Sequence, residues 1–283
     1  MYEDIISMRL KKYTINSIDD EENALKEILQ EVLLYGLSTT DFFRKALFQG
    51  GTALRILHDL PRFSEDLDFI LMTPEPLFRW ETYFVAIKKS CALFAIEPSV
   101  IDKDKAGSNV KKMFLKDDSI GKILNLNFHH SARKKLTIKL EIDTNPPEGS
   151  QAQIKFLDFP IDYSINAQDL SSNFAGKCHA LLCREYIKGR DWYDFTWYTQ
   201  QKIVPNLTFL QNALKQQGPW KNQSLDMSLP FLAQALIVKI KTIDWEKAKA
   251  DVAPFLRPLE KQSIALWGED FFIDKALKLD PSK

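Results

Sequence analysis

Two aspartates one residue apart, Asp66 and Asp68, have the type and spacing that metal-assisted chemistry requires. They border and interrupt the apolar run Leu67–Met72, which predicts a short strand, and side chains two apart on a strand point to the same face. Two carboxylates on one face repel each other, so that one becomes protonated, unless a cation lies between them. Hard oxygen ligands suit Mg²⁺, which is usually held by one or two carboxylates and substrate phosphates. We therefore predict a site for Mg²⁺ or Mn²⁺ at Asp66 and Asp68.

A third carboxylate is expected from a neighbouring strand. Residues 136–143 alternate between apolar and polar side chains, and Glu141 and Asp143 share the polar face. We predict Glu141 as the third metal ligand and as the general base for an acceptor hydroxyl, with Asp143 as the alternative. Such a set suits phosphoryl or nucleotidyl transfer, in which metals hold the attacking and leaving oxygens.

A glycine pair before the aspartates predicts phosphate binding. Gly50 and Gly51 at a helix start let backbone N–H groups approach a phosphate closely, and Thr52 adds a hydroxyl donor. We assign phosphate or nucleotide binding to these three residues, to Arg55 and to Ser64. Taken alone, a Gly-Gly pair is usually a turn and an Asp-x-Asp pair is usually a solvated strand edge, but here the pieces occur in order.

Basic and acidic residues further along the chain form a second group. Lys177 and Arg184 are seven residues apart, so they share one helix face and could hold a triphosphate. The residues alone favour two ordinary surface side chains. Asp191 and Asp194 follow Gly189 closely, where they could cap a helix and pair with Arg190. The functional alternative is that Asp191 orients Lys177 or the nucleotide.

These segments together resemble the nucleotidyltransferase toxins of the AbiEii/AbiGii type, which include the MenT toxins of type IV toxin–antitoxin systems. The resemblance covers about residues 45–200 and rests on Gly50-Gly51-Thr52, Arg62-x-Ser64-x-Asp66-x-Asp68-Phe69, Lys177, Arg184 and Arg190-Asp191-Trp192-Tyr193-Asp194. It implies a polymerase-β-type fold, Mg²⁺, a nucleoside triphosphate donor and a separately encoded antitoxin. Some members modify tRNA. The resemblance also favours catalytic roles for Lys177 and Asp191, and nucleotide binding by Arg184 and Asp194.

The elements that would position these residues indicate an α/β (α+β) protein with a mixed sheet. Helical spacing of apolar residues predicts helices over 19–47, 52–60 and 77–95, and strands and loops over 96–140. After about Asn166 the pattern is helical almost to the end. We predict a nucleotidyltransferase core with N-terminal helices at 1–160 and a helical C-terminal domain at 161–283.

Composition limits where the protein works and what it binds. No apolar run reaches the ~18 residues of a membrane span, and the early charges Glu3, Asp4 and Arg9 argue against a signal peptide. The three cysteines are too few for a disulfide framework and predict a reducing, cytoplasmic setting. Formal charge balances, with 38 basic and 38 acidic residues, so no general attraction to nucleic acid is indicated.

The charge is nevertheless uneven along the chain, and this suggests an acceptor. Between Lys103 and Lys139 the acids are only Asp104, Asp117 and Asp118. The basic residues are Lys103, Lys105, Lys111, Lys112, Lys116, Lys122, Arg133, Lys134, Lys135 and Lys139. The run leads into the strand with Glu141, so we predict an RNA acceptor, most plausibly tRNA. The alternatives are a protein or small-molecule acceptor, which the balanced charge suits, and a non-catalytic nucleotide-binding module.

Overall fold

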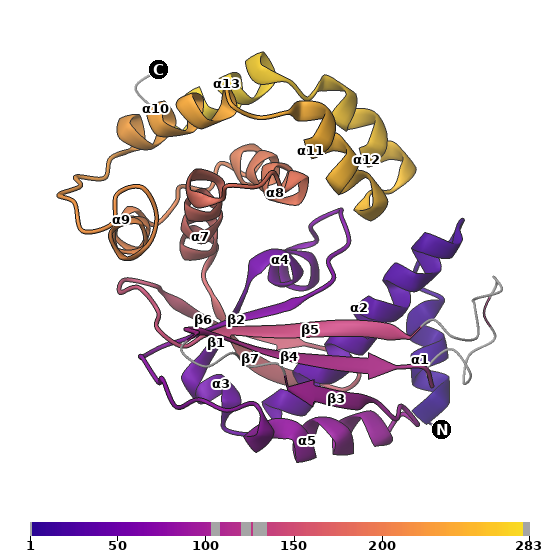
Figure 1. Cartoon of the computed structure of the whole chain (residues 1–283). Helices are drawn as coiled ribbons and strands as arrows, with labels where there is room; N and C mark the ends of the chain where they lie inside the picture. The colour runs from indigo at the N-terminus through magenta and orange to yellow at the C-terminus, as the bar shows by residue number, and fades with distance from the viewer. Residues whose placement is uncertain (1, 103–107, 120–125, 127–134, 280–283) are drawn as a thin grey trace. The chain divides into compact units, whose positions relative to one another are not determined.

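The computed structural model describes residues 2–102, 108–119, 126 and 135–279, and the chain divides into two compact units (Figure 1). The first unit comprises Met1–His58, Phe63–Pro146 and Ala152–Ala167. The second comprises Asp59–Arg62, Pro147–Gln151 and Gln168–Lys283. The main division therefore falls between Ala167 and Gln168, and two short segments from the first 160 residues belong to the second unit.

The first unit is built on a mixed sheet of seven strands in the order β3-β4-β5-β2-β1-β7-β6. The strands are β1 (Ala46–Gln49), β2 (Leu67–Leu71), β3 (Ser99–Asp102), β4 (Val110–Asp117), β5 (Leu136–Asp143), β6 (Ala152–Leu157) and β7 (Tyr163–Gln168). β2 runs parallel to β5 and β1 runs parallel to β7, whereas β1–β2, β3–β4 and β4–β5 are antiparallel. The expected α/β class with a mixed sheet is confirmed.

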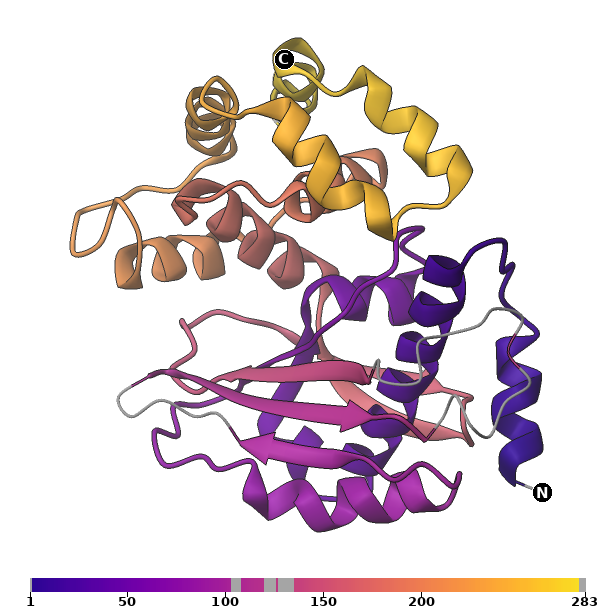
Figure 2. The same cartoon turned by 45° about the vertical axis from the view of Figure 1, so that its right-hand side comes forward.

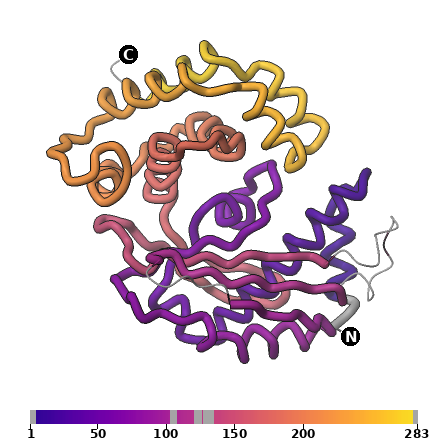
Figure 3. Tube along the Cα trace, viewed as in Figure 1, coloured from indigo at the N-terminus to yellow at the C-terminus, as the bar shows by residue number. Residues whose placement is uncertain are grey.

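Helices cover both faces of this sheet. They are α1 (Tyr2–Leu10), α2 (Ile18–Ser38), α3 (Phe42–Lys45), α4 (Gly50–His58) and α5 (Glu81–Ala92). α2 packs along α5, and a Cβ on Gly36 would lie only 3.1 Å from the Cβ of Ser90, so this glycine permits the close approach. Figures 1 and 2 show α4 on the face of the sheet opposite α5. Figure 3 traces the chain from α2 through β1 into α4.

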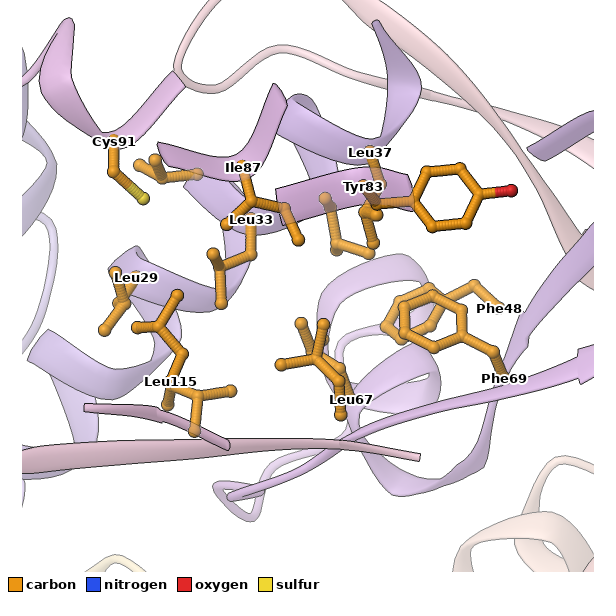
Figure 4. Close-up of a cluster of buried hydrophobic side chains, with 14 of the residues drawn as sticks. Leu29, Leu33, Leu37, Phe48, Leu67, Phe69, Tyr83, Ile87, Cys91 and Leu115 are labelled. Atoms are coloured by element: carbon orange, nitrogen blue, oxygen red, sulfur yellow. The ribbon is translucent and has the colours of Figure 1, made fainter. Parts of the chain in front are cut away.

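The main core lies between the sheet and the helices α2 and α5 (Figure 4). Its labelled side chains are Leu29, Leu33, Leu37, Phe48, Leu67, Phe69, Tyr83, Ile87, Cys91 and Leu115, and all of them are buried. Strand side chains alternate between faces, so the residues between these apolar ones point to the α4 side of the sheet. In β5, for example, Ile138, Leu140 and Ile142 are fully buried, while Lys139 and Glu141 stay partly exposed. The core therefore fixes which face carries the charged residues.

Two parts of this unit differ from the sequence-based prediction. The helix expected over 19–47 ends at Ser38, because the hydroxyls of Thr39 and Thr40 donate to the carbonyls of Gly36 and Leu37 at its last turn. After the short helix α3 the chain forms β1, whose apolar residues pair with β2 and β7 in the centre of the sheet. Strands β6 and β7 lie where we placed only a boundary, since their segment lacks the clean alternation of β5.

The second unit consists mainly of helices, as expected for the C-terminal part. They are α7 (Leu170–Cys183), α8 (Gly189–Gln200), α9 (Leu207–Gln216), α10 (Leu229–Ile240), α11 (Trp245–Val252), α12 (Pro258–Ser263) and α13 (Glu269–Leu277), with 3-10 turns at Ala253–Phe255 and Ile264–Leu266. Trp192 of α8, Trp245 of α11 and Phe272 of α13 pack together, with the Trp245 and Phe272 rings stacked 4.2 Å apart. Among the described residues, no helix has the length and apolar character needed to cross a membrane.

Candidate active site

Three carboxylates meet on the α4 side of the sheet in the first unit. Asp68 of β2 is the register partner of Glu141 in the parallel strand β5, and of Gln49 in β1. Asp66 immediately precedes β2, two residues before Asp68. Register partners on adjacent strands lie side by side, so the pairing places Asp68 beside Glu141. Asp66 and Glu141 both contact Lys139.

Two lysines contact these carboxylates. The Nζ of Lys139 lies 2.9 Å from Asp66 Oδ2 and 3.0 Å from Glu141 Oε2. The Nζ of Lys112 lies 2.6 Å from Glu141 Oε1. We predicted both lysines only as part of an acceptor-binding run, and their contacts with the carboxylates were missed. The signal was available for Lys139, which stands two residues before Glu141 in an alternating strand and so shares its face.

The lysines set the protonation of this cluster. Burial by itself would raise the pKa of Glu141, but the hydrogen bonds and charges of Lys112 and Lys139 lower it below its ordinary value. Burial would likewise lower the pKa of Lys139, and Asp66 and Glu141 raise it instead. At neutral pH the site is therefore a charged set in which an ammonium group lies between two carboxylates.

The residue types fit a divalent cation. Carboxylate oxygens are the ligands Mg²⁺ prefers, and the Lys139 ammonium already stands as a cation between Asp66 and Glu141. As they lie, however, no three acidic, histidine or cysteine side chains of the described residues are grouped closely enough to hold a metal. A metal held by Asp66 and Glu141 would have to displace the Lys139 ammonium.

Glycine is required at the start of α4. Gly50 has a φ of +81°, a conformation that other residues rarely adopt. A Cβ at this position would also lie 2.6 Å from Asp68 Oδ2, so the Asp68 carboxylate packs directly against the first residue of the helix. The positive end of a helix dipole favours a negative group there, whether a carboxylate or a phosphate.

The other predicted phosphate-binding residues have different surroundings from those expected. Thr52 is fully buried and its hydroxyl donates to the backbone carbonyl of Asp66, so it fixes the aspartate loop and does not present a donor to a phosphate. Gly51 is buried beside it. Arg55 forms an ion pair with Glu27 at 2.7 Å and lies over the ring of Phe63, 4.7 Å from its centroid.

Ser64 and Asp143 were also predicted as possible site residues. Ser64 is half-buried, and its carbonyl accepts a hydrogen bond of 3.0 Å from the Gln30 amide. Asp143, the alternative third carboxylate, is the register partner of Ile70 and accepts a hydrogen bond of 2.9 Å from the backbone N–H of Asn145. The register thus favours Glu141 over Asp143 as the neighbour of Asp68.

A second charged cluster lies inside the second unit. The Nζ of Lys177 lies 2.9 Å from Asp191 Oδ1 and 2.8 Å from Asp194 Oδ2. Arg184, the C-cap residue of α7, places Nη1 3.0 Å from Asp191 Oδ2. Arg62 donates two hydrogen bonds, of 2.7 and 2.6 Å, to the two oxygens of Asp194. The expected contact between Asp191 and Lys177 is therefore present, whereas Arg62 was not among the predicted site residues.

This second cluster carries more positive than negative charge. Arg62, Lys177 and Arg184 contact the two carboxylates, and the charge of Lys188 also acts on Asp191. Arg62, Asp191 and Asp194 are at most 2% exposed. Burial alone would raise the pKa of Asp191, but the charges of Lys177, Arg184 and Lys188 lower it well below its ordinary value. The surplus positive charge suits an anion, and Arg184 is the most exposed of the three cations, with 31% of its side chain accessible.

Other expectations from the sequence can also be placed. Arg190 lies over the ring of Phe255, 4.3 Å from its centroid, and its Nε lies 3.8 Å from Asp251 Oδ2. Half of the basic run lies outside the described residues, namely Lys103, Lys105, Lys122, Arg133 and Lys134.

Comparisons with known proteins bear on both the fold and the chemistry of the chain. A family model described as "Nucleotidyl transferase AbiEii toxin, Type IV TA system" matches residues 32–273. The structure is similar to that of MenT4, a nucleotidyltransferase toxin of Mycobacterium tuberculosis H37Rv, with a TM-score of 0.56 and 15% identity over 99% of this chain and 91% of MenT4.

A more remote likeness is JHP933 of Helicobacter pylori, with a TM-score of 0.47 and 18% identity over 92% of this chain and 89% of that one. No curated protein matches the sequence. The likeness to MenT4 bears on the fold, and the family match, which spans most of the chain, bears on the activity.

Proposed function

We propose, from the premise that this chain belongs to the AbiEii family of type IV nucleotidyltransferase toxins, that it transfers a nucleoside monophosphate from a nucleoside triphosphate to RNA. The acceptor we propose is tRNA, and the biological role is that of a cytoplasmic toxin with a separately encoded antitoxin. The observation that carries the chemistry is the meeting of Asp66, Asp68 and Glu141 on one face of the sheet.

In this proposal Asp66, Asp68 and Glu141 hold Mg²⁺ or Mn²⁺, and the bound cation supplies charge neutralisation at the phosphate oxygens. The acceptor hydroxyl oxygen attacks the α-phosphorus of the triphosphate. A new P–O bond forms, the bond to the bridging oxygen of the β-phosphate breaks, and pyrophosphate leaves. The proton of the hydroxyl passes to the carboxylate of Glu141, which its lysine neighbours keep ionised.

Two groups of residues are proposed for phosphate binding, one in each unit. Backbone N–H groups at Gly50 and Gly51 begin α4 and suit an anion. In the second unit, Lys177 and Arg184 are the cations proposed for phosphate, and Asp191 and Asp194 position the Lys177 ammonium. Arg62 in turn fixes Asp194 through its two hydrogen bonds. Arg55 and Ser64 complete the proposed nucleotide-binding set.

A second candidate function keeps the chemistry and changes the acceptor to a protein side chain or a small molecule. The balanced formal charge of the chain favours this second function, because proteins that bind RNA non-specifically usually carry a net positive charge. A nucleotide-binding module without turnover is the third possibility, and the retention of all three carboxylates argues against it.

One experiment separates these functions. The purified chain is incubated with each α-³²P-labelled triphosphate and Mg²⁺, together with total RNA, protein extract or small metabolites from bacterial cells. We expect label in the tRNA fraction, and none with Asp66→Asn or Asp68→Asn, both of which should fold because they relieve carboxylate repulsion. Label in protein or metabolites would favour the second function, and nucleotide binding without label in any fraction would favour the third.

A further inference from the structure

An aromatic side chain lies among the lysines on the face of the sheet that carries the carboxylates. In β4, Met113 and Leu115 are fully buried and point toward the core. Lys112, Phe114 and Lys116 alternate with them and therefore point to the opposite face. The contact of 2.6 Å between Lys112 and Glu141 places this face on the side of the candidate active site.

The strand register places Phe114 beside the carboxylate cluster. Phe114 is the register partner of Lys139 in β5, whose ammonium contacts Asp66 and Glu141. Two residues further along β4, Lys116 is paired with Thr137. Partner residues on adjacent antiparallel strands have Cα atoms about 4.5–5.5 Å apart. The half-buried ring thus lies on the strand next to Lys139, whose ammonium contacts two of the proposed catalytic carboxylates.

Lysine and aromatic side chains that alternate on a sheet face match the chemistry of single-stranded nucleic acid. Bases stack on aromatic rings with little sequence preference, and ammonium groups hold the phosphates between them. The described acids near this part of the face are those of the candidate active site and Asp118, which follows β4 and lies 3.5 Å from the Nζ of Lys135. Asp117 points into the core and is 1% exposed. The register partners of Lys116 are Thr137 and Ser99, and its ammonium adds positive charge to this face.

We propose that Phe114 is the stacking platform for a nucleobase at the reacting end of a single-stranded RNA acceptor, with Lys116 holding an adjacent phosphate. This inference rests on the proposed function, because it specifies where the RNA acceptor of that reaction binds. Stacking on Phe114 requires that the reacting end of the acceptor is unpaired, since a base within a duplex cannot stack on a protein ring.

The test is direct binding of RNA without turnover. Fluorescence anisotropy measures the affinity of the chain for a fluorescein-labelled single-stranded RNA of mixed sequence, in EDTA and without triphosphate. We expect Phe114→Ala to weaken binding about 5-fold to 100-fold, the effect of about 1–3 kcal/mol for one stacked base. Phe114→Leu, which keeps apolar volume but has no π face, should lose most of this affinity, whereas Phe114→Trp should keep it.

Two controls make the result specific. Phe156→Ala removes a ring that is 83% exposed on β6, at the other edge of the same sheet, and should leave RNA affinity unchanged. Lys116→Gln should weaken binding and reduce its dependence on salt, by a log–log slope of about 0.7 for each phosphate that is no longer neutralised. Thermal denaturation of each variant excludes loss of folding as the cause.

The outcomes separate this inference from the function beneath it. If the wild-type chain labels tRNA but Phe114→Leu and Phe114→Trp both bind RNA as the wild type does, the platform is wrong and the proposed function stands. Equal losses of affinity for Phe114→Ala and Phe156→Ala would also overturn the platform. If the wild-type chain neither binds nor labels RNA, both proposals fail together.

Discussion

At the scale of single residues, the most informative feature is an ammonium group between two carboxylates. Lys139 lies within 3.0 Å of both Asp66 and Glu141, and these three side chains are 19–29% exposed. Partly exposed ion pairs contribute little each, but here one cation keeps two like charges apart. The same position is where a divalent cation would bind, so lysine and metal compete for the same oxygens.

Lys139→Met should therefore have opposite effects on the metal-free and metal-bound protein. Without metal, the unfolding temperature should fall because Asp66 and Glu141 lose their shared partner. The affinity for Mn²⁺ should rise because no ammonium has to be displaced. Thermal denaturation in EDTA and titration of free Mn²⁺ by electron paramagnetic resonance measure the two effects. Lys116→Met, on the same face of the sheet, is the control, and unchanged Mn²⁺ affinity in Lys139→Met would refute the competition.

Lys177 has two possible roles, one as an ion-pair partner within the second unit and one as a ligand of the triphosphate. It binds Asp191 and Asp194 in a buried cluster, and the family resemblance assigns it to the triphosphate. We expect Lys177→Ala to reduce kcat/KM by at least about 100-fold, and Lys177→Arg to recover little, because a planar guanidinium does not replace a compact ammonium at a phosphate. Steady-state kinetics with varied triphosphate measure this.

Stability distinguishes phosphate binding from a purely structural role for Lys177. Removal of one partner of a buried ion pair costs about 3–5 kcal/mol, so Lys177→Ala should also unfold at a lower temperature. Lys177→Arg keeps a positive charge and should recover much of the stability while activity stays low. Activity that returns in step with stability would assign Lys177 to the structure alone.

The residue types of both clusters could be predicted, but several of their partners could not. The spacing of Asp66 and Asp68 and the alternation around Glu141 indicated one acidic face, and the register brings them together. Thr52 was assigned to phosphate because hydroxyls are phosphate donors, yet its hydroxyl bonds the Asp66 carbonyl. The residue type indicates which interactions a side chain can make, whereas its burial and its neighbours determine which interaction it makes in the folded protein.

At the scale of elements, close approach of backbones decides where glycine is needed. A Cβ on Gly189, at the start of α8, would lie 1.8 Å from the carbonyl oxygen of Ala248 in α11. Gly176 lies within α7, and a Cβ there would meet nothing within 4 Å. A methyl group would therefore clash at Gly189 and would meet open space at Gly176.

Gly189→Ala and Gly176→Ala should change stability in opposite directions. A methyl group at position 189 forces α8 away from α11, and overpacking of this kind typically costs about 1–3 kcal/mol. At position 176 alanine improves the helix by roughly 0.5–1 kcal/mol, because it reduces the backbone freedom lost on folding. Urea denaturation of the two variants beside the wild type measures both, and destabilisation of equal size would show that packing at Gly189 is not the cause.

A buried acid on α2 links pH to stability. Glu31 is 2% exposed and forms an ion pair with Arg9 of α1, with a hydrogen bond of 3.0 Å from the Arg9 Nε. Burial raises the pKa of Glu31 from 4.5 to about 7, although Arg9 opposes this rise. A carboxyl whose pKa is higher in the folded state binds protons more tightly there than in the unfolded chain.

This group should therefore contribute stability at acid pH that is lost as pH rises from about 4.5 to about 7. Glu31→Gln, which cannot ionise, should remove that part of the pH dependence. Thermal denaturation of both proteins across this range gives the comparison. If the two profiles stay parallel throughout, Glu31 ionises normally and its pair with Arg9 outweighs burial.

The local spacing of apolar residues predicted some elements well, but it failed where the conformation depends on pairing with distant strands. The alternation over 136–143 predicted β5 with its observed limits, since one face is fully buried and the other is polar. The short central strand β1 was assigned to the end of a helix and the break after it, because its three apolar residues are too few to show a period. Its conformation depends on pairing with β2 and β7, which are distant in sequence.

At the scale of the whole molecule, long-range pairs lie beyond what a single sequence reveals. Arg62 and Asp194 are 132 residues apart and form a doubly hydrogen-bonded buried pair. Both were visible in recognisable motifs, but nothing in their local spacing states that they meet. The overall α/β class, by contrast, follows from counting strand-like and helical segments, and it was predicted correctly.

The neutral net charge of the chain conceals an uneven distribution, and this leads to the last prediction. Lys111, Lys112 and Lys135 belong to the described part of the basic run, and Lys134 lies outside the described residues. Replacement of these four lysines by glutamine should weaken RNA binding and flatten its salt dependence, by a log–log slope of about 0.7 for each phosphate that no longer has a cationic partner. Triphosphate binding should change little, since the residues proposed for the triphosphate lie elsewhere in the sequence.

A second variant with the same charge change tests whether position matters. Lys202, Lys221, Lys241 and Lys247 are exposed residues of the second unit, outside both clusters. Their replacement by glutamine removes the same four positive charges, so any effect of net charge alone appears equally in both variants. Affinity for labelled RNA between about 50 and 200 mM salt is measured for each. Equal weakening would attribute RNA binding to the overall field of the protein, whereas a reduction confined to the first variant places the acceptor along the run that leads into Glu141.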